Sequence, residues 1–177
     1  SLKGHAGYVW IVAYSPDGET VAVSGGGHIR LIDAGTREQL AAARVSASRI
    51  AFTRDGSQLV AFGGGHALIN VRDATTLAAT GAPIKPEGVH GAYVGSYFEP
   101  PGFALMPDGR SVVIATTPRC SPNCARSGTW DEDKLVWWNL RRRTPTKRLA
   151  IGTGQHALAL SPDGRTAAVG IDRGLQL

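Results

Sequence analysis

The sequence has few cysteines, few charged residues and no long apolar run. Two cysteines in 177 residues are too few for a disulfide scaffold, and they favour a reducing cytoplasm. No apolar run approaches the roughly 20 residues that a membrane helix requires. The first residues, Ser1 to His5, contain neither an initiator methionine nor a signal-peptide pattern. We therefore expect a cytoplasmic chain with no membrane partner, cut from a longer protein.

The residue types that are present indicate a folded domain with many turns. Hydrophobic residues make up 42% and charged residues 19%, which is typical of a globular chain rather than a disordered one. Glycine, with 23 of 177 residues, is about twice as frequent as usual and suits tight turns. The net charge of +5 is mild, and nucleic-acid binding would require those charges to gather on one face. We expect no nucleic-acid partner.

A four-residue phrase that ends in Asp-Gly occurs four times, each time between two short apolar runs. The copies are Ser15-Pro16-Asp17-Gly18, Thr53-Arg54-Asp55-Gly56, Met106-Pro107-Asp108-Gly109 and Ser161-Pro162-Asp163-Gly164. Proline presets φ at the second position of a turn, aspartate accepts hydrogen bonds from the following N–H groups, and glycine takes a positive φ. Such a turn between two apolar runs predicts a β-hairpin, so the sequence predicts an all-β repeat protein.

The spacing of the hairpins predicts propeller blades. The four turn aspartates lie at positions 17, 55, 108 and 163, so the steps are 38, 53 and 55 residues. One four-stranded propeller blade takes roughly 40–45 residues. The first unit is predicted to contain strands at 9–14, 20–24 and 28–33, and the second at 50–52, 59–62 and 68–73. Residues 39–45 are predicted to form the outer or inner strand of the next unit, depending on how the blades are counted.

Two insertions lengthen the later steps. One lies near residues 83–102 and carries Tyr93, Tyr97 and Phe98. The other lies near residues 117–133 and carries Trp130, both cysteines and a final acidic run that we expect to be a solvated loop face. We expect a single, partial propeller domain over residues 1–177, with approximate units 1–36, 37–76, 77–140 and 141–177. The last of these blades is predicted to be incomplete.

The units resemble WD-repeat β-propellers. The resemblance rests on Gly4-His5, on the four Asp-Gly hairpins, and on three strand ends that stand where the family has Trp-Asp. These strand ends are Ile32-Asp33, Arg72-Asp73 and Trp138-Asn139. The resemblance implies a β-propeller with about four four-stranded blades, in a divergent bacterial member of the family. It also implies a partial propeller from a larger signalling or regulatory protein.

No cofactor, metal or catalytic site is predicted. Cys120 and Cys124 could chelate a metal, but structural metal sites of this kind use four ligands and no second cysteine pair exists, so we expect free or locally bridged thiols. The glycine runs at 25–27 and 63–65 resemble phosphate-binding loops. Such loops lead into a helix, whereas here strands follow, so hairpin turns are the better interpretation. No nucleophile with a neighbouring base and no paired carboxylates emerge.

The sequence therefore predicts a non-catalytic protein-interaction or sensing scaffold. The candidate partner contacts are the aromatic side chains of the insertions and one basic run. These residues are Tyr93, Tyr97, Phe98, Trp130, Arg141, Arg142 and Arg143. Contacts with other domains of the parent protein are a further expectation. The alternative is a propeller enzyme of the hydrolase or lyase type, whose site would be completed by blades outside this chain.

Overall fold

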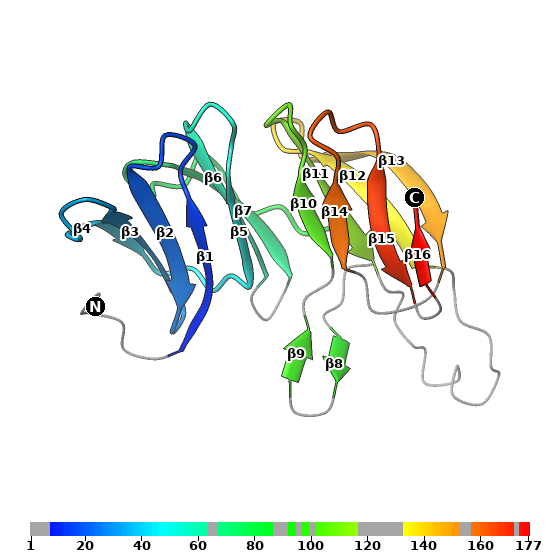
Figure 1. Cartoon of the computed structure of the whole chain (residues 1–177), viewed down its shortest axis with the longest axis horizontal. Coiled ribbons are helices and arrows are strands. Elements are labelled where there is room, and N and C mark those ends of the chain that lie inside the picture. Colours follow the sequence, from blue (N-terminus) through cyan, green and yellow to red (C-terminus); the bar gives the residue numbers. More distant parts are fainter. Residues whose placement is uncertain are drawn as a thin grey trace. The chain divides into compact units, whose positions relative to one another are not determined.

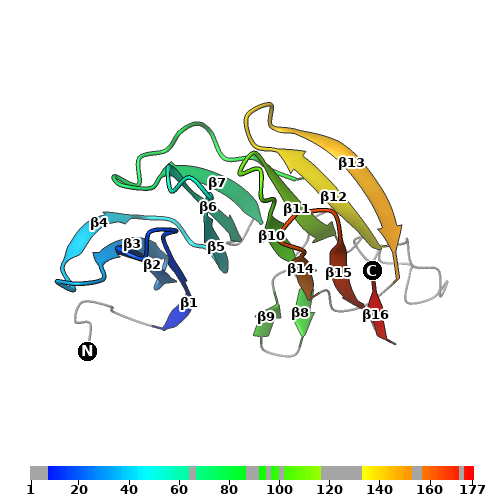
Figure 2. The same cartoon turned by 45° about the horizontal axis from the view of Figure 1, so that its top comes forward.

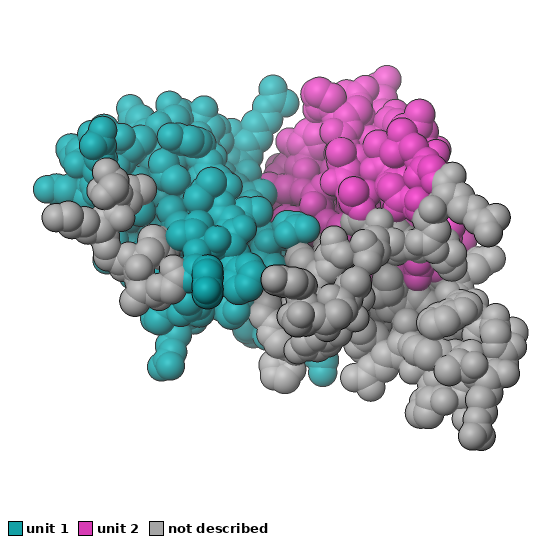
Figure 3. Space-filling model, turned by 60° about the horizontal axis from the view of Figure 1, so that its bottom comes forward, with its two compact units in different colours: residues 1–85 teal, residues 86–177 magenta. Residues whose placement is uncertain are grey.

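The computed structural model describes eight stretches of the chain. They are residues 8–63, 67–86, 92–94, 97–99, 102–116, 133–152, 157–171 and 174–177, with the backbone alone described at 92–94 and 97–99. The regular structure in these stretches is entirely β. The chain divides into two compact units, residues 1–85 and residues 86–177, which Figure 3 colours teal and magenta.

Unit 1 contains two antiparallel sheets (Figure 1). The first sheet has the order β1-β2-β3-β4, with β1 at Val9–Tyr14, β2 at Thr20–Gly25, β3 at His28–Asp33 and β4 at Gln39–Ala43. The second sheet has the order β5-β6-β7, with β5 at Arg49–Phe52, β6 at Gln58–Gly63 and β7 at Leu68–Asp73. Because β4 pairs with β3, the strand that we counted with the next unit is instead the fourth strand of the first sheet.

Unit 2 contains a short hairpin and two larger sheets (Figure 2). The hairpin pairs β8 at Ala92–Val94 with β9 at Tyr97–Glu99. The third sheet joins β10 at Phe103–Leu105, β11 at Ser111–Thr116, β12 at Asp133–Asn139 and β13 at Thr144–Ile151, in that order. The fourth sheet joins β14 at Leu158–Leu160, β15 at Ala167–Ile171 and β16 at Gly174–Gln176.

The predicted fold class is confirmed. The two units hold four antiparallel sheets of three or four strands in chain order, as expected for about four blades. The division into repeat units stays a prediction. Asp133, which we expected on a solvated loop face, opens β12 and is buried, so that interpretation is wrong for this residue.

All four Asp-Gly turns have the predicted geometry. Their glycines have positive φ angles, which are 77° at Gly18, 69° at Gly56, 63° at Gly109 and 70° at Gly164. In each turn the aspartate accepts a hydrogen bond from the N–H group two residues later, at 2.8–3.1 Å. The hairpins are thus stabilised by local hydrogen bonds, because the aspartate of each turn accepts a hydrogen bond from a backbone N–H group of the same turn.

The core of each unit lies between its sheets. In unit 1, Ala22, Ile29 and Leu31 of the first sheet pack against Ile50 and Leu59 of the second. In unit 2, the cluster joins side chains of the third sheet to others of the fourth, including Val113, Ala115, Leu135 and Val169. Side chains alternate along a strand, so each sheet has one face in this core and one face directed away from it.

The turn aspartates should make stability depend on pH in the acidic range. The Ser15 hydroxyl and the Glu19 N–H hold the pKa of Asp17 below its ordinary value, and the Thr53 hydroxyl and the Ser57 N–H do the same for Asp55. A carboxyl whose pKa is lower in the folded state stabilises the fold above the pKa of the unfolded state, and this contribution is lost as pH falls through the folded value. The free energy of unfolding should therefore decline below about pH 4.

Urea unfolding at several pH values tests this expectation. The double variant Asp17→Asn, Asp55→Asn should lose less stability than the wild type as pH falls below about 4, because the asparagine side chains do not titrate. Parallel curves for the two proteins would contradict the assignment. The variant Asp17→Glu is a matched control, since it keeps an acidic group at the same turn.

Candidate protein-interaction surface

The structure describes three of the seven predicted contact residues with their side chains. Arg141, Arg142 and Arg143 form the turn between β12 and β13, and all three are exposed. Tyr93 belongs to β8, and Tyr97 and Phe98 belong to β9, but their side chains lie outside the described residues. Trp130 also lies outside them.

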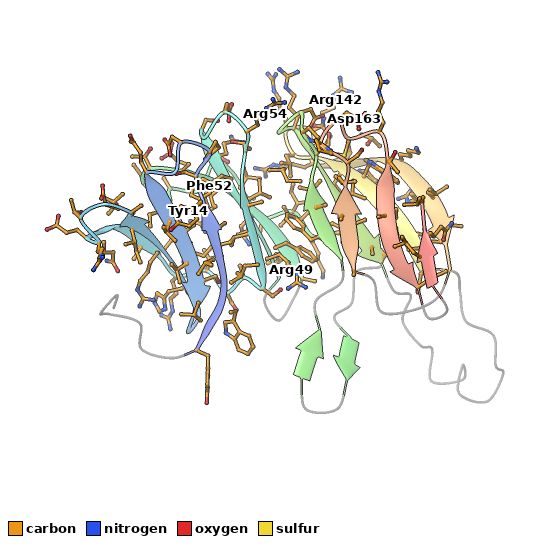
Figure 4. The ribbon with its side chains drawn as sticks, in the orientation of Figure 1. Tyr14, Arg49, Phe52, Arg54, Arg142 and Asp163 are labelled. Atoms are coloured by element: carbon orange, nitrogen blue, oxygen red, sulfur yellow. The ribbon has the colours of Figure 1, made fainter. Side chains whose placement is uncertain are left out.

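The β12–β13 turn is fixed by its own hydrogen bonds. The side-chain Oδ1 of Asn139 accepts a hydrogen bond from the Arg142 N–H at 2.7 Å, and the Asn139 carbonyl accepts one from the Arg143 N–H at 2.8 Å. Arg143 has a φ of 59°, in the left-handed region, and Leu140 is buried beneath the turn. The three arginine side chains are therefore presented outward from a well-anchored backbone. Figure 4 labels Arg142 at this end of unit 2.

Two neighbouring turns add further arginines to the same surface. The Arg110 carbonyl, in the β10–β11 turn, accepts a hydrogen bond from the Leu140 N–H at 2.9 Å. Gly164, in the β14–β15 turn, packs so closely on the β10–β11 turn that a Cβ there would lie 2.9 Å from Cδ of Pro107. The three turns, 106–110, 140–143 and 161–165, therefore adjoin, and we call them together the basic turn end. Arg110 and Arg165 are both exposed.

The basic turn end has an excess of positive charge. Its charged residues are five arginines and two aspartates, Asp108 and Asp163. Asp108 accepts hydrogen bonds from the N–H groups of Arg110 at 2.8 Å and Ser111 at 3.1 Å. The Ser161 hydroxyl and the Arg165 N–H hold the pKa of Asp163 below its ordinary value. Both carboxylates are thus engaged in turn structure, and the guanidinium groups dominate the outer surface.

Sequence reasoning missed Arg110 and Arg165. The available signal was the residue after Asp-Gly, which is arginine in the third and fourth hairpins but Glu19 and Ser57 in the first and second. This difference became informative only when the turns were known to adjoin the run at 141–143.

The described residues show no sign of a metal centre. No group of three or more His, Cys, Asp or Glu side chains lies together among them. Cys120 and Cys124 lie outside the described residues. Residues 26–27 form the predicted tight turn between β2 and β3, whereas residues 64–66 of the second glycine run are not described. No helix among the described residues is long and apolar enough to cross a membrane.

Comparison with known proteins gives a match to one repeat and a set of similar folds. The family model of the WD domain, G-beta repeat, matches residues 1–33. No curated protein matches the chain. Hydrazine synthase of Kuenenia stuttgartiensis is similar in structure, with a TM-score of 0.70, 18% identity, and coverage of 90% of this chain and 49% of that one.

Two further solved structures are similar. The β-propeller domain of Cps50 (Swd1) from Myceliophteria thermophila has a TM-score of 0.66 and 15% identity, with 96% of this chain and 53% of that one covered. A chain of the mitotic checkpoint complex has a TM-score of 0.70 and 17% identity, with 98% and 49% covered. This chain therefore spans about half the length of the structures it matches.

The similarity to β-propeller structures agrees with the antiparallel sheets and their succession along the chain. At 15–18% identity the solved structures show the fold alone, whereas the repeat match covers only residues 1–33. The chain therefore has the fold of a β-propeller segment, and its residues 1–33 match a WD repeat.

Proposed function

We propose that this propeller segment is a non-catalytic protein-interaction platform, and that its basic turn end binds an acidic stretch of a partner protein. The observation that supports the proposal is the gathering of five exposed arginines from three adjoining turns. Turns carried on a rigid β scaffold commonly form binding surfaces, because the strands hold them in place. Arginine suits this role since its planar guanidinium can bind a carboxylate with two parallel hydrogen bonds.

An acidic protein segment fits this surface better than a nucleic acid. Binding of single-stranded nucleic acid uses aromatic side chains on which bases stack, in addition to positive charge. The three turns of the basic turn end contain no aromatic residue; their large apolar members are Met106 and Leu140. Carboxylates therefore match the chemistry of the surface more completely than bases do.

Charge reversal at the β12–β13 turn tests the proposal. The triple variant Arg141→Glu, Arg142→Glu, Arg143→Glu should weaken binding of a fluorescent glutamate-rich peptide by at least about tenfold, or about 1.4 kcal/mol. Wild-type affinity should fall as salt is raised, and the variant should show less of this dependence. Fluorescence anisotropy measures both quantities.

A matched control exists in unit 1. Arg37, Arg44 and Arg54 are also exposed, and Arg37 has a φ of 68°, close to that of Arg143. Reversing these three charges changes the net charge equally but leaves the basic turn end intact, so peptide binding should change little. Equal losses in the two triple variants would contradict a localised site. Tighter binding of a single-stranded oligonucleotide than of the peptide would assign the surface to nucleic acid instead.

The proposal also includes the aromatic contact residues that were predicted from the sequence. Tyr93, Tyr97 and Phe98 belong to the β8–β9 hairpin, which is an addition to the repeating sheets of unit 2. Aromatic residues are enriched at protein interfaces, so this hairpin and Trp130 are proposed as a second contact region. An enzymatic role would draw support only from a similarity of fold, which is shared by proteins of unrelated function.

A further inference from the structure

The outer edge of the third sheet is a long strand that pairs on one side only. β13, at Thr144–Ile151, has eight residues and is the longest of the described strands. It pairs with β12 and is last in the order of the third sheet, so Figure 2 shows it at the outer border of that sheet. Within the described part of the chain, no strand lies along its other side. Such an edge presents backbone groups with which a further strand can pair.

The register shows which backbone groups of β13 face outward. The Leu140 N–H donates to the Arg110 carbonyl, so the even-numbered residues of β12 direct their backbone groups to β11 and the odd-numbered ones to β13. Leu149 pairs with an odd-numbered residue of β12 and therefore faces that strand. Its neighbours Arg148 and Ala150 direct their N–H and C=O groups outward, and both residues are exposed. The edge thus offers donors and acceptors to an added strand at these two positions.

The positive charge of the β12–β13 turn continues along this edge. Residues 140–151 contain no acidic residue, and their cations are Arg141, Arg142, Arg143, Lys147 and Arg148. The equivalent strand of the first sheet differs, because β4, at Gln39–Ala43, contains no charged residue. A basic outer edge is therefore a property of the third sheet and not of every fourth strand in the described part of the chain.

These charges determine which kind of strand can be added to β13. Charged side chains and proline on an edge strand oppose pairing with other strands, and β13 contains Pro145, Lys147 and Arg148. A second copy of β13 would place like charges opposite one another, which is destabilising. An acidic strand instead brings carboxylates to the guanidinium and ammonium groups, which form strong charge-assisted hydrogen bonds with them. The edge therefore selects an acidic strand over a neutral one and over its own copy.

We propose that the acidic segment of the partner binds in an extended conformation as a fifth strand on β13. This inference rests on the proposed function and adds the conformation and the position of the bound segment. In such a complex the backbone hydrogen bonds supply affinity, and alternate side chains supply specificity. Segment residues opposite Arg148 and Ala150 direct their side chains to the same face as these two residues. Acidic residues are therefore expected at every second position of the segment, with β-forming residues such as valine between them.

Fluorescence anisotropy with a peptide as long as β13, in which glutamate and valine alternate, tests the added strand. N-methylation of the glutamates should weaken binding by at least about tenfold, because it removes the N–H groups that pair with β13. N-methylation of the valines should leave binding nearly unchanged, since their N–H groups point away from β13. The two methylated peptides have the same charge, length and number of methyl groups, so each is the control for the other.

A matched pair of proline variants tests the same edge from the protein. Ala150→Pro removes an outward N–H group of β13 and should weaken binding of the unmodified peptide. Ala42→Pro, on β4, should not. The Ala34 N–H donates to the Glu19 carbonyl, so the even-numbered residues of β3 face β2, and the exposed Ala42, which pairs with Arg30, faces outward. Circular dichroism checks that both variants are folded.

The outcomes separate this inference from the proposed function. No binding of the unmodified peptide would overturn both. If that peptide binds, equal affinities for the two methylated peptides, or weaker binding of the valine-methylated one, would overturn the added strand and leave the proposed function intact. A wild type that dimerises in sedimentation velocity, while Ala150→Pro stays monomeric, would assign the edge to a second copy of the chain instead.

Discussion

Replacing Leu59 with alanine is expected to lower the free energy of unfolding by about 2–5 kcal/mol. Leu59 is the second residue of β6, has no exposed surface and packs between the first and second sheets of unit 1. Its neighbours there include Leu31 and Ile50, which belong to different sheets. The loss combines the transfer free energy of the removed methyl groups with the cost of the remaining cavity, because hydrogen-bonded sheets can close only partly around it.

Urea unfolding followed by circular dichroism measures this loss, and hydrogen exchange shows whether it is concentrated in β1–β7. Leu149→Ala is the matched control, because the same substitution at a side chain that is 46% exposed removes much less buried surface. Exposed substitutions of this kind usually change stability by no more than about 0.5 kcal/mol. A Leu59→Ala variant with the stability of the control would show that the two sheets of unit 1 are not held together by this core.

The hairpins could be predicted from the sequence because their determinants are local. The strands expected at 9–14, 28–33 and 68–73 agree with β1, β3 and β7 residue for residue. Each of these strands ends or begins next to a turn whose proline, aspartate or glycine restricts the backbone within a few residues. The alternation of apolar and polar side chains then selects the face that enters the core.

Pairing and burial between distant segments could not be predicted in the same way. Residues 39–43 have an apolar pattern that suits either neighbouring sheet, and only the pairing with β3 assigns them to the first. Asp133 follows two further acidic residues in the sequence, yet pairing with Ile151 makes it the buried first residue of β12. The sheet to which a strand belongs, and the burial of its residues, depend on which strand pairs with it. The residues that determine this pairing are spread over the whole repeat.

The candidate surface could likewise be predicted only in part from the sequence. The run at 141–143 is visible in the sequence, but Arg110 and Arg165 join it only through the packing of three turns. The adjacent Trp137 and Trp138 point to opposite faces of β12, where they pair with Val113 and Val112 of β11. Trp138 is buried, whereas Trp137 is partly exposed with the Lys147 ammonium 4.7 Å from its ring centre.

Replacing Gly63 with alanine should also destabilise unit 1 strongly, for two separate reasons. Gly63 ends β6 with a φ of 126°, a conformation that side-chain-bearing residues adopt at a cost of about 1–3 kcal/mol. In addition, an added Cβ would lie 2.8 Å from the backbone nitrogen of Ser48 and would contact its hydroxyl. The Ser48 N–H donates a hydrogen bond to the Phe62 carbonyl at 3.0 Å, so Ser48 cannot retreat without weakening that bond. Overpacking of this kind costs about a further 1–3 kcal/mol.

Gly27 separates the two contributions. It also has a positive φ, 77°, but an added Cβ there would meet no atom within 4 Å, so Gly27→Ala reports backbone strain without a steric clash. Urea unfolding should therefore rank the proteins as wild type, Gly27→Ala and Gly63→Ala in order of decreasing stability. Adding Ser48→Gly to Gly63→Ala removes the side-chain part of the clash and should recover part of the loss. Equal stabilities for the two alanine variants would mean that Ser48 yields freely, and that the start of β5 is not anchored by its hydrogen bond to the end of β6.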